Sequence, residues 1–280
     1  MPRASIHLAV YINRLVVYDD RMAQSQDAAV ARADGGVRSV ARAVEVLDLF
    51  DREHPLRTLR EIVALTELPK TTVVRLLSTL EALGLVIDRG DSSFGPGAGF
   101  LRWVTLAQSL WDVSARVRDV MTRLVDVHGE TVNIYVRRDA IRVSIAQVEG
   151  TATVRSVVQV GVPYSLASGA AGKVLLGGAS AAVLHQVVER EPEARLEELR
   201  REAAGVLEAG YAITHGDREL GASAVAAPIR TADGRIGAAL SMSGPSSRFT
   251  ADRVGHYVDA VTAAATEISA LGLGPVEVLL

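Results

Sequence analysis

The stretch LREIVALTELPKTTVVRLLSTLEALGLVIDRGDSSFGPG, residues 59–97, decides the fold of the first half of the chain. A short helical pattern follows Thr58, a predicted N-cap that has Glu61 at the spacing of a capping box. Pro69 then occupies the predicted first position of a second helix, which runs to about Leu83. The remaining residues are two short extended pieces around the polar turn DRGD, which predicts a hairpin.

Upstream of this stretch, the sequence RSVARAVEVLDLF (38–50) carries one apolar stripe at helical spacing. Three helices followed by a hairpin predict a winged helix-turn-helix over residues 38–97. On the third helix, the predicted apolar arc consists of Val73, Leu76, Leu77, Leu80 and Leu83, and the opposite face carries Thr71, Arg75, Ser78 and Ala82. Such a face suits a DNA major groove, and the alternative is the solvated face of an ordinary three-helix bundle.

The charge of this segment limits how it can bind nucleic acid. Residues 38–95 hold eight basic and nine acidic side chains, a net charge of −1. Nonspecific affinity for DNA comes from neutralising several phosphates at once, so binding through phosphates alone would be weak. We therefore expect groove contacts and more than one copy of the chain per site, since two-fold symmetry doubles each contact.

The second half has a different pattern. A long amphipathic helix is predicted over residues 100–128, and its first half, with Trp103 and Trp111, is interpreted as a linker and dimer contact or as a helix packed on its own domain. Strands and helices then alternate in the pattern of an α+β domain. The predicted strands cover residues 131–138, 140–148, 153–160 and 210–216, with a hairpin at 232–234, and the predicted helices cover 169–178, 181–190, 193–209 and 250–271.

Composition bounds the possible functions. The 280 residues include 33 acidic and 30 basic side chains, 49% hydrophobic residues and no cysteine, which indicates about two domains without disulfides or thiolate metal sites. No apolar run reaches the roughly 18 residues of a membrane span. We expect a cytoplasmic protein in which residues 1–37 form a poorly ordered extension, with Met22 as an alternative start.

The motifs identify a family resemblance. The segments RSVARAVEVLDLF (38–50) and LREIVALTELPKTTVVRLLSTLEALGLV (59–86) resemble the DNA-binding half of the IclR family of bacterial transcription regulators. Three later segments are similar to the effector-binding half of that family, and the resemblance covers residues 38–272. These segments are GETVNIYV (129–136), VGVPYSLASGAAGKVLL (160–176) and GYAITHGDRELGASAVAAPIRTADGRIGAALSMSGPSSRFT (210–250).

The resemblance implies a winged helix-turn-helix at 38–97, a linker helix at 98–113 and a GAF-like effector-binding domain at 114–280. It also implies a homodimer or a dimer of dimers on a double-stranded DNA operator. Thr71, Thr72 and Arg75 match the positions at which the family contacts DNA, and the outer face adds Ser78. Lys70 and the wing-tip Arg89 are assigned to phosphates, where the wing is the predicted hairpin.

The resemblance places the effector pocket between the sheet and the segment LASGAAGK (166–173). Free N–H groups at the start of the helix in that segment suit a carboxylate. Ala224 stands where many family members carry a cysteine, and each candidate alone is also explained as a helix cap or a satisfied core group. The candidate effector-binding residues are Asn133, Tyr135, Ser168, Gly169, Ala170, Asp217, Glu219, Ala224, Ser241 and Ser243.

The sequence lacks the motifs of the common enzyme classes that its segments superficially resemble. The GAAGKV segment lacks the first glycine and the Ser/Thr of a phosphate loop, no G-x-S-x-G elbow exists, and the six histidines lack metal-ligand spacing. We expect no catalytic residues, metal or cofactor. The sequence predicts a DNA-binding regulator that responds to a small carboxylate or an aromatic acid. The alternative is a small-molecule sensor whose helix-turn-helix serves dimerisation without specific DNA binding.

Overall fold

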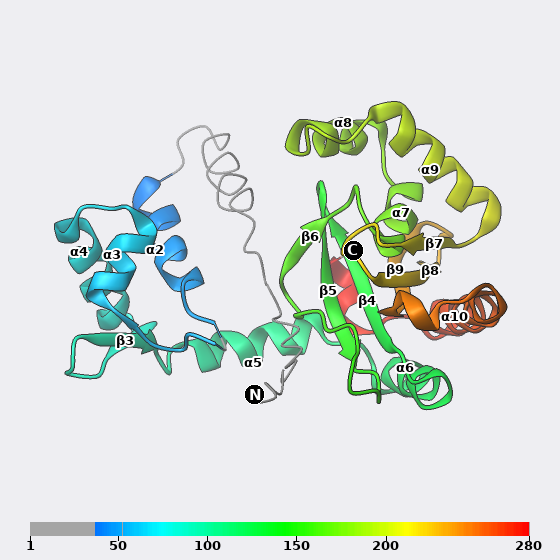
Figure 1. Cartoon of the computed structure of the whole chain (residues 1–280). Coiled ribbons are helices and arrows are strands. Elements are labelled where there is room, and N and C mark those ends of the chain that lie inside the picture. The colour runs from blue at the N-terminus through cyan, green and yellow to red at the C-terminus, as the bar shows by residue number, and fades with distance from the viewer. Residues whose placement is uncertain (1–36, 52, 280) are drawn as a thin grey trace, which may run out of the picture. The chain divides into compact units, whose positions relative to one another are not determined.

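The computed structural model describes residues 37–51 and 53–279, and the chain divides into two compact units, Met1–Val104 and Thr105–Leu280 (Figure 1). The predicted N-terminal extension and the alternative start at Met22 lie outside the described residues, apart from Val37. Each unit has a hydrophobic core of its own, so each is described by itself.

Three helices form the body of the first unit: α2 (Arg38–Asp48), α3 (Leu59–Thr66) and α4 (Lys70–Ala82). The predicted capping box of α3 is confirmed, because the Glu61 N–H donates to Thr58 Oγ1 at 3.3 Å and the Thr58 N–H donates to Glu61 Oε2 at 2.7 Å. Pro69 is the N-cap of α4 and not its first helical residue, since its ψ of 135° is still extended.

The predicted hairpin is confirmed as β2 (Val86–Asp88) and β3 (Ser93–Pro96), and together these strands form the wing. A two-residue strand, β1 (Arg57–Thr58), pairs antiparallel with β3 and completes a sheet of order β1-β3-β2. The sequence did not predict β1, because two residues are too few to show an alternating pattern. The extra strand fixes the start of α3 against the wing.

The core of the first unit is built from the inner faces of the three helices and the wing. One residue of the predicted apolar arc departs from this picture, because Leu83 is 60% exposed. Leu83 is the C-cap of α4, where the helix ends and its face no longer continues toward the core. The fully buried core residues are Val46, Ile62, Val73, Leu77, Leu80 and Val86.

The predicted single helix over residues 100–128 is wrong, because the structure has two helices there: α5 (Phe100–Trp111) and α6 (Ala115–His128). Ser114 separates them: its backbone is extended, and its hydroxyl accepts a hydrogen bond from the Val117 N–H at 3.4 Å. A serine at this position is a standard N-cap, and it starts a new helix where the apolar spacing alone indicated continuity.

The second unit is built on a six-stranded antiparallel sheet of order β6-β5-β4-β9-β8-β7. The strands β8 and β9, whose bounds follow, form the predicted hairpin, and Gly234 in the turn between them has a φ of +83°. The bounds are β4 (Thr131–Arg138), β5 (Ile141–Val148), β6 (Pro163–Ser165), β7 (Ala212–His215), β8 (Ala222–Arg230) and β9 (Ile236–Pro245).

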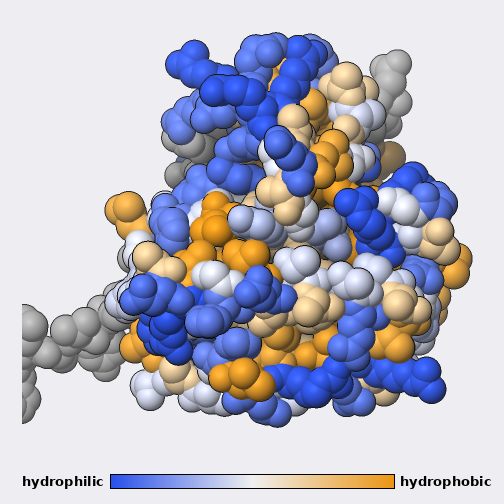
Figure 2. All heavy atoms as spheres, turned by 90° about the vertical axis from the view of Figure 1, so that its right-hand side faces the viewer, coloured by the Kyte–Doolittle hydropathy of each residue, from blue (hydrophilic) through white to orange (hydrophobic). Residues whose placement is uncertain are grey.

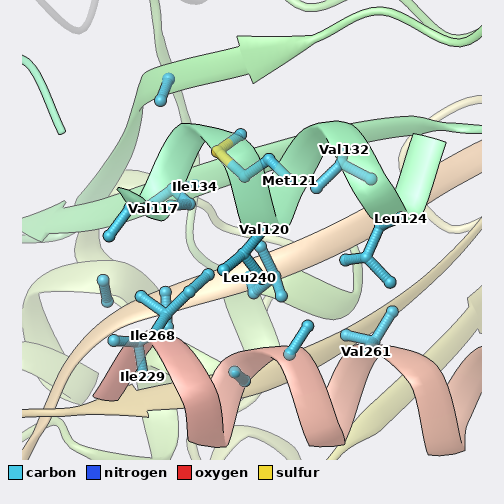
Figure 3. Close-up of a cluster of buried hydrophobic side chains, with 14 of the residues drawn as sticks. Val117, Val120, Met121, Leu124, Val132, Ile134, Ile229, Leu240, Val261 and Ile268 are labelled. Carbon is cyan, nitrogen blue, oxygen red and sulfur yellow. The ribbon is translucent and has the colours of Figure 1, made fainter. Parts of the chain in front are cut away.

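Helices cover both faces of this sheet (Figure 1). On one face lie α6 and α10 (Ala251–Leu271), and Figure 3 shows their apolar side chains meeting those of the sheet. On the other face lie α7 (Ala170–Gly177) and α9 (Leu196–Ala209), with α8 (Ala181–Arg190) packed on α9. Figure 2 faces the side with α9 and α10, where hydrophilic residues gather over the upper part.

The predicted strand over residues 153–160 is wrong, because this segment has no regular secondary structure. Its backbone groups bond to side chains of the sheet: the Ser156 carbonyl accepts from Thr131 Oγ1 at 2.6 Å, and the Val158 N–H donates to Gln147 Oε1 at 2.8 Å. These side chains take the place of a neighbouring strand. Two short 3-10 helices, Ser246–Arg248 and Pro275–Leu279, complete the unit.

Candidate functional site

The first candidate site is the outer face of α4 together with the tip of the wing. The predicted DNA-contacting side chains begin at the first residue of α4 and follow one face, which is open to solvent in this unit. Arg89 lies in the turn between β2 and β3. Lys70, Thr71, Arg75, Ser78 and Arg89 are exposed, and Thr72 is half-buried.

Carboxylates of the wing shape its tip. Asp88 Oδ1 accepts a hydrogen bond from the Gly90 N–H at 2.7 Å, and Asp91 Oδ1 accepts one from the Ser93 N–H at 3.0 Å. The hydrogen bonds from Ser93 hold the pKa of the Asp91 carboxyl below its ordinary value. Arg89 is therefore presented on a turn that its neighbours fix, which suits a contact with a phosphate.

Charge is distributed unevenly along α4. A hollow of about 300 Å³ lies between the helix and the wing, and Ser78 lines it together with the carboxylates of Glu81 and Asp88. Those acidic groups would repel phosphates next to the second half of the helix. Lys70 and Arg75 lie in the first half, so the first turns of α4 are the part that fits an anionic groove.

The second candidate site is the face of the large sheet that α7 covers. Asn133 is paired with Ser241 across β4 and β9, and Ser243 is paired with Ala224 across β9 and β8. Tyr135 follows Asn133 on the same face at the two-residue period of a strand. The structure therefore brings these five predicted residues onto one face, with Asn133, Tyr135 and Ser241 buried.

Arg142, which is not among the predicted site residues, lies on this face at the start of β5, next to the edge strand β6. The side chain is only 2% exposed, and its Nη1 donates to the carbonyls of Ser165 and Ser168, the latter at 2.6 Å. Its Nε has no hydrogen-bond partner, and no carboxylate of the described residues forms an ion pair with it. Burial lowers the pKa of Arg142 to about 10.

Aromatic rings and a second guanidinium surround Arg142. Its guanidinium carbon lies 5.5 Å from the ring centre of Tyr135 and 5.9 Å from that of Tyr164. The guanidinium carbon of Arg218 also lies 5.6 Å from the ring centre of Tyr164. Burial raises the pKa of the Tyr135 hydroxyl, although both arginines act in the opposite direction. The site thus holds two positive charges and two phenol rings.

Asn133 adds a second unsatisfied donor. The side chain is fully buried, and its Oδ1 accepts a hydrogen bond from Ser144 Oγ at 3.4 Å, while its Nδ2 has no partner among the described residues. Ser144 is paired with Tyr135 across β4 and β5, so these groups share the face with Arg142. Two buried donors without acceptors on one face are unusual in a folded protein.

The start of α7 differs from the prediction, because two of its N–H groups already have acceptors. The Gly169 N–H donates to Asp217 Oδ2 at 2.8 Å, and the Ala170 N–H donates to Thr214 Oγ1 at 3.1 Å. Thr214 of β7 and Asp217 of the loop after it therefore cap the helix with oxygen atoms of the chain itself. Ser168 contributes its carbonyl to Arg142.

The two predicted acidic residues of that loop are not brought together with the sheet face. Asp217 serves the cap of α7 and also lies 3.7 Å from Lys173 Nζ, which pairs with Glu202 at 2.5 Å. The Glu219 side chain is 71% exposed and lies 3.7 Å from the Arg218 guanidinium. Asp217 is thus a structural group in this unit, and Glu219 points to solvent.

The sequence held a signal for Arg142. The segment IRVSIAQV is a strand with one arginine and one serine two residues apart, so both lie on the same face as neighbouring polar residues. The close approach of α7 was not visible in the sequence. A Cβ at Gly172 would lie 2.9 Å from Arg142 Nη1 and 2.5 Å from the Leu166 carbonyl oxygen, so only glycine leaves room for the guanidinium there.

This arrangement can bind an acceptor-rich or anionic small molecule. Arg142 Nε and Asn133 Nδ2 supply donors, two arginines supply charge, and the tyrosine rings supply apolar area. No group of three or more metal-ligating side chains occurs in the described part of the chain.

Family models match both units of the chain. The IclR helix-turn-helix model covers residues 39–88, and the C-terminal model of the bacterial transcriptional regulator IclR covers residues 106–270. The chain belongs to the IclR family. Members of this family regulate transcription and are not enzymes, so this IclR protein is a DNA-binding transcriptional regulator.

Curated relatives agree with this assignment. The HTH-type transcriptional regulator KipR of Bacillus subtilis is 27% identical over 83% of this chain and 96% of its own length. The HTH-type transcriptional regulator BhcR of Paracoccus denitrificans is 30% identical over 88% of this chain and 90% of its own length.

Solved structures support the fold of the IclR regulator. An IclR-family putative transcriptional regulator from Rhodococcus sp. is 46% identical with a TM-score of 0.59, covering 87% of this chain and 97% of its own. An IclR homologue from Microbacterium hydrocarbonoxydans, complexed with 4-hydroxybenzoate, is 25% identical with a TM-score of 0.68, covering 86% of this chain and 99% of its own. Among the described residues, no helix is long and apolar enough to cross a bilayer.

Proposed function

We propose that this regulator binds a small organic acid on the sheet face under α7 and that the acid changes its affinity for an operator. The observation that carries this proposal is Arg142, a buried guanidinium with an unpartnered Nε and no ion-pair partner among the described residues. Leaving a charge buried without a counter-charge costs several kcal/mol, roughly. A carboxylate ligand supplies the missing charge and accepts the free hydrogen bond.

The apolar surroundings favour an aromatic acid. The rings of Tyr135 and Tyr164 flank the guanidinium and supply apolar surface beside the charge. Asn133 Nδ2 can donate to a second polar group of the same ligand, such as a ring hydroxyl. The 4-hydroxybenzoate complex of the Microbacterium homologue supports this class of ligand.

The DNA-binding half of the proposal rests on the exposed first turns of α4. Thr71, Thr72, Arg75 and Ser78 face the bases of a major groove in this interpretation, with Lys70 and Arg89 on phosphates. Because the DNA is the partner, the protein works in the bacterial cytoplasm.

A homodimer or a dimer of dimers supplies the second half-site. Residues 101–110 of α5 are all exposed, although half of them are large and apolar. An apolar helical surface of this kind is typical of a protein–protein contact. The exposed large apolar residues are Leu101, Trp103, Val104, Leu106 and Leu110.

Calorimetry with a neutral ligand analogue tests the effector site. We expect 4-hydroxybenzoate to bind the wild-type protein and 4-hydroxybenzamide, which lacks the charge, to bind about 10-fold more weakly or not at all. Arg142→Met should abolish this discrimination, and Arg230→Met, an exposed arginine at the end of β8, is the matched control. Full-affinity binding of the acid by Arg142→Met, or no binding of any aromatic or aliphatic carboxylate by the wild type, refutes the proposal.

A gel shift with DNA from around the protein's own gene tests the operator half. We expect sequence-dependent retention that weakens as salt rises, and a change in retention when the acid is added. Retention that is absent at low salt would instead support the alternative of a sensor whose helix-turn-helix serves dimerisation.

A further inference from the structure

The end of α5 packs on the core of the second unit. Residues 101–110 of this helix are exposed, but Trp111, its last residue, is half-buried and packs against the core between α6 and the sheet. Val113, two residues later, is only 4% exposed and belongs to that core. A movement of this core can therefore reach the linker through Trp111 and Val113.

Arg138, the last residue of β4, holds the ring of Trp111. Its guanidinium carbon lies 5.0 Å from the ring centre, which is the distance of a cation–π contact. The same guanidinium donates from Nη1 to the carbonyl of Leu279 at 3.4 Å. Arg138 thus connects three segments that are far apart in the sequence: the linker, the sheet and the chain after α10.

The segment Gly272–Leu279 also contacts the junction between α5 and the second unit's core. The Ser114 N–H, between α5 and α6, donates to the Leu273 carbonyl at 3.1 Å. Leu273 and Val276 are 2% and 0% exposed, so the segment is anchored in the core and does not simply lie on the surface. The Leu273 N–H donates to Glu277 Oε1 at 2.8 Å, which fixes the turn of the segment itself.

The β4–β5 hairpin connects this junction to the candidate effector site. Arg138 is paired with Ile141, and Arg137 is paired with Arg142, so Arg142 is one position along the ladder from the residue pair that holds Trp111. Tyr135 lies three residues before Arg138 on the same strand. A ligand that pulls on Arg142 therefore acts on the short hairpin that also positions Arg138.

We propose that Arg138 is a positioning residue that passes the state of the Arg142 site to the linker helix through Trp111, with Gly272–Leu279 acting as a strap that fixes the junction. This inference rests on the proposed effector function. Effector and operator are then coupled through one strand pair and one aromatic ring. Removing Arg138 should break the coupling while both binding surfaces remain intact.

The first test compares three proteins: wild type, Arg138→Ala and the control Arg230→Ala, which changes an exposed arginine at the end of β8. A typical coupling changes operator affinity about 5–150-fold on effector binding. With 4-hydroxybenzoate as the probe, we expect Arg138→Ala to keep the acid affinity and the acid-free operator affinity, measured by calorimetry and fluorescence anisotropy. Its acid-induced change in operator affinity should fall to about 2-fold or less. A full response in Arg138→Ala overturns the inference.

The second test needs no ligand, so it separates this inference from the proposed function. The chain has two tryptophans, so Trp103→Phe leaves Trp111 as the only one. In that background we expect Arg142→Met to shift the emission of Trp111 when Arg138 is present and to leave it unchanged when Arg138→Ala is added. An emission that Arg142→Met does not alter overturns the coupling, whereas failure of every acid to bind overturns only the effector proposal.

Discussion

The ion pair between Glu130 and Arg248 yields a prediction with a large expected effect. The Glu130 side chain is 1% exposed, and both of its oxygens accept hydrogen bonds from Arg248, one of them from Nη2 at 2.7 Å. Arg248→Ala leaves that carboxylate buried without the one side-chain partner that it has among the described residues. Breaking a buried pair in this way costs about 3–5 kcal/mol.

The assay measures the unfolding transition of the second unit, by heating and in urea. For a unit of this size, 1 kcal/mol corresponds to roughly 2–4 °C, so we expect Tm to fall by about 6–20 °C. The double variant Glu130→Gln/Arg248→Ala should recover most of this loss, since it removes the buried charge. The reasoning is refuted if Arg248→Ala costs less than about 1 kcal/mol or if the double variant is no more stable than the single one.

Three further predictions concern DNA binding, a helix cap and pH. Arg75→Ala should weaken operator binding by about 1–3 kcal/mol per half-site without changing the unfolding temperature, and an unchanged anisotropy titration would contradict this. Thr58→Ala removes the cap of α3 and should cost about 0.5–2 kcal/mol in urea unfolding, whereas Thr58→Ser should be nearly neutral. Burial, with the nearby Arg253 and His256, lowers the pKa of His128. The unfolded state then binds more protons than the folded state, so the stabilisation should be full above about pH 6.5 and fall as the pH drops below that value. Urea titrations at about pH 7.5 and pH 5.5 measure this difference, and His128→Gln should reduce it.

Local signals in the sequence predicted most of the elements. The capping box at Thr58 and the polar turn of the wing are short-range patterns, and both are confirmed because their hydrogen bonds close within four residues or one hairpin. The break at Ser114 is also a local signal, but the apolar spacing on either side of it masked the cap. The prediction of a strand at 153–160 was wrong for another reason. The composition of this segment is typical of a strand, but its backbone groups bond to side chains of β4 and β5 and not to a neighbouring strand.

The candidate site was predicted only in part, because its chemistry depends on contacts between distant segments. The alternation along β4 and β9 placed Asn133, Tyr135 and Ser241 on one face correctly as strand positions. A strand pattern does not indicate whether a hydrogen-bond donor already has an acceptor within the protein. The structure shows that the Gly169 and Ala170 N–H groups at the start of α7 are used and that Arg142 Nε is not, which favours the sheet over the helix as the centre of the candidate site.

The self-capped start of α7 has a consequence for how ligand preference can change. Asp217 and Thr214 hold the helix, and Asn133, Arg142 and Ser241 present their side chains from the strands. Under the proposed function, Asn133 and Ser241 would face a ligand without supporting the start of α7, whereas Arg142 also holds the Ser165 and Ser168 carbonyls before that helix. Exchanging Asn133 or Ser241 alters what is recognised without removing a helix cap, so new preferences can be introduced one substitution at a time on a frame that stays folded.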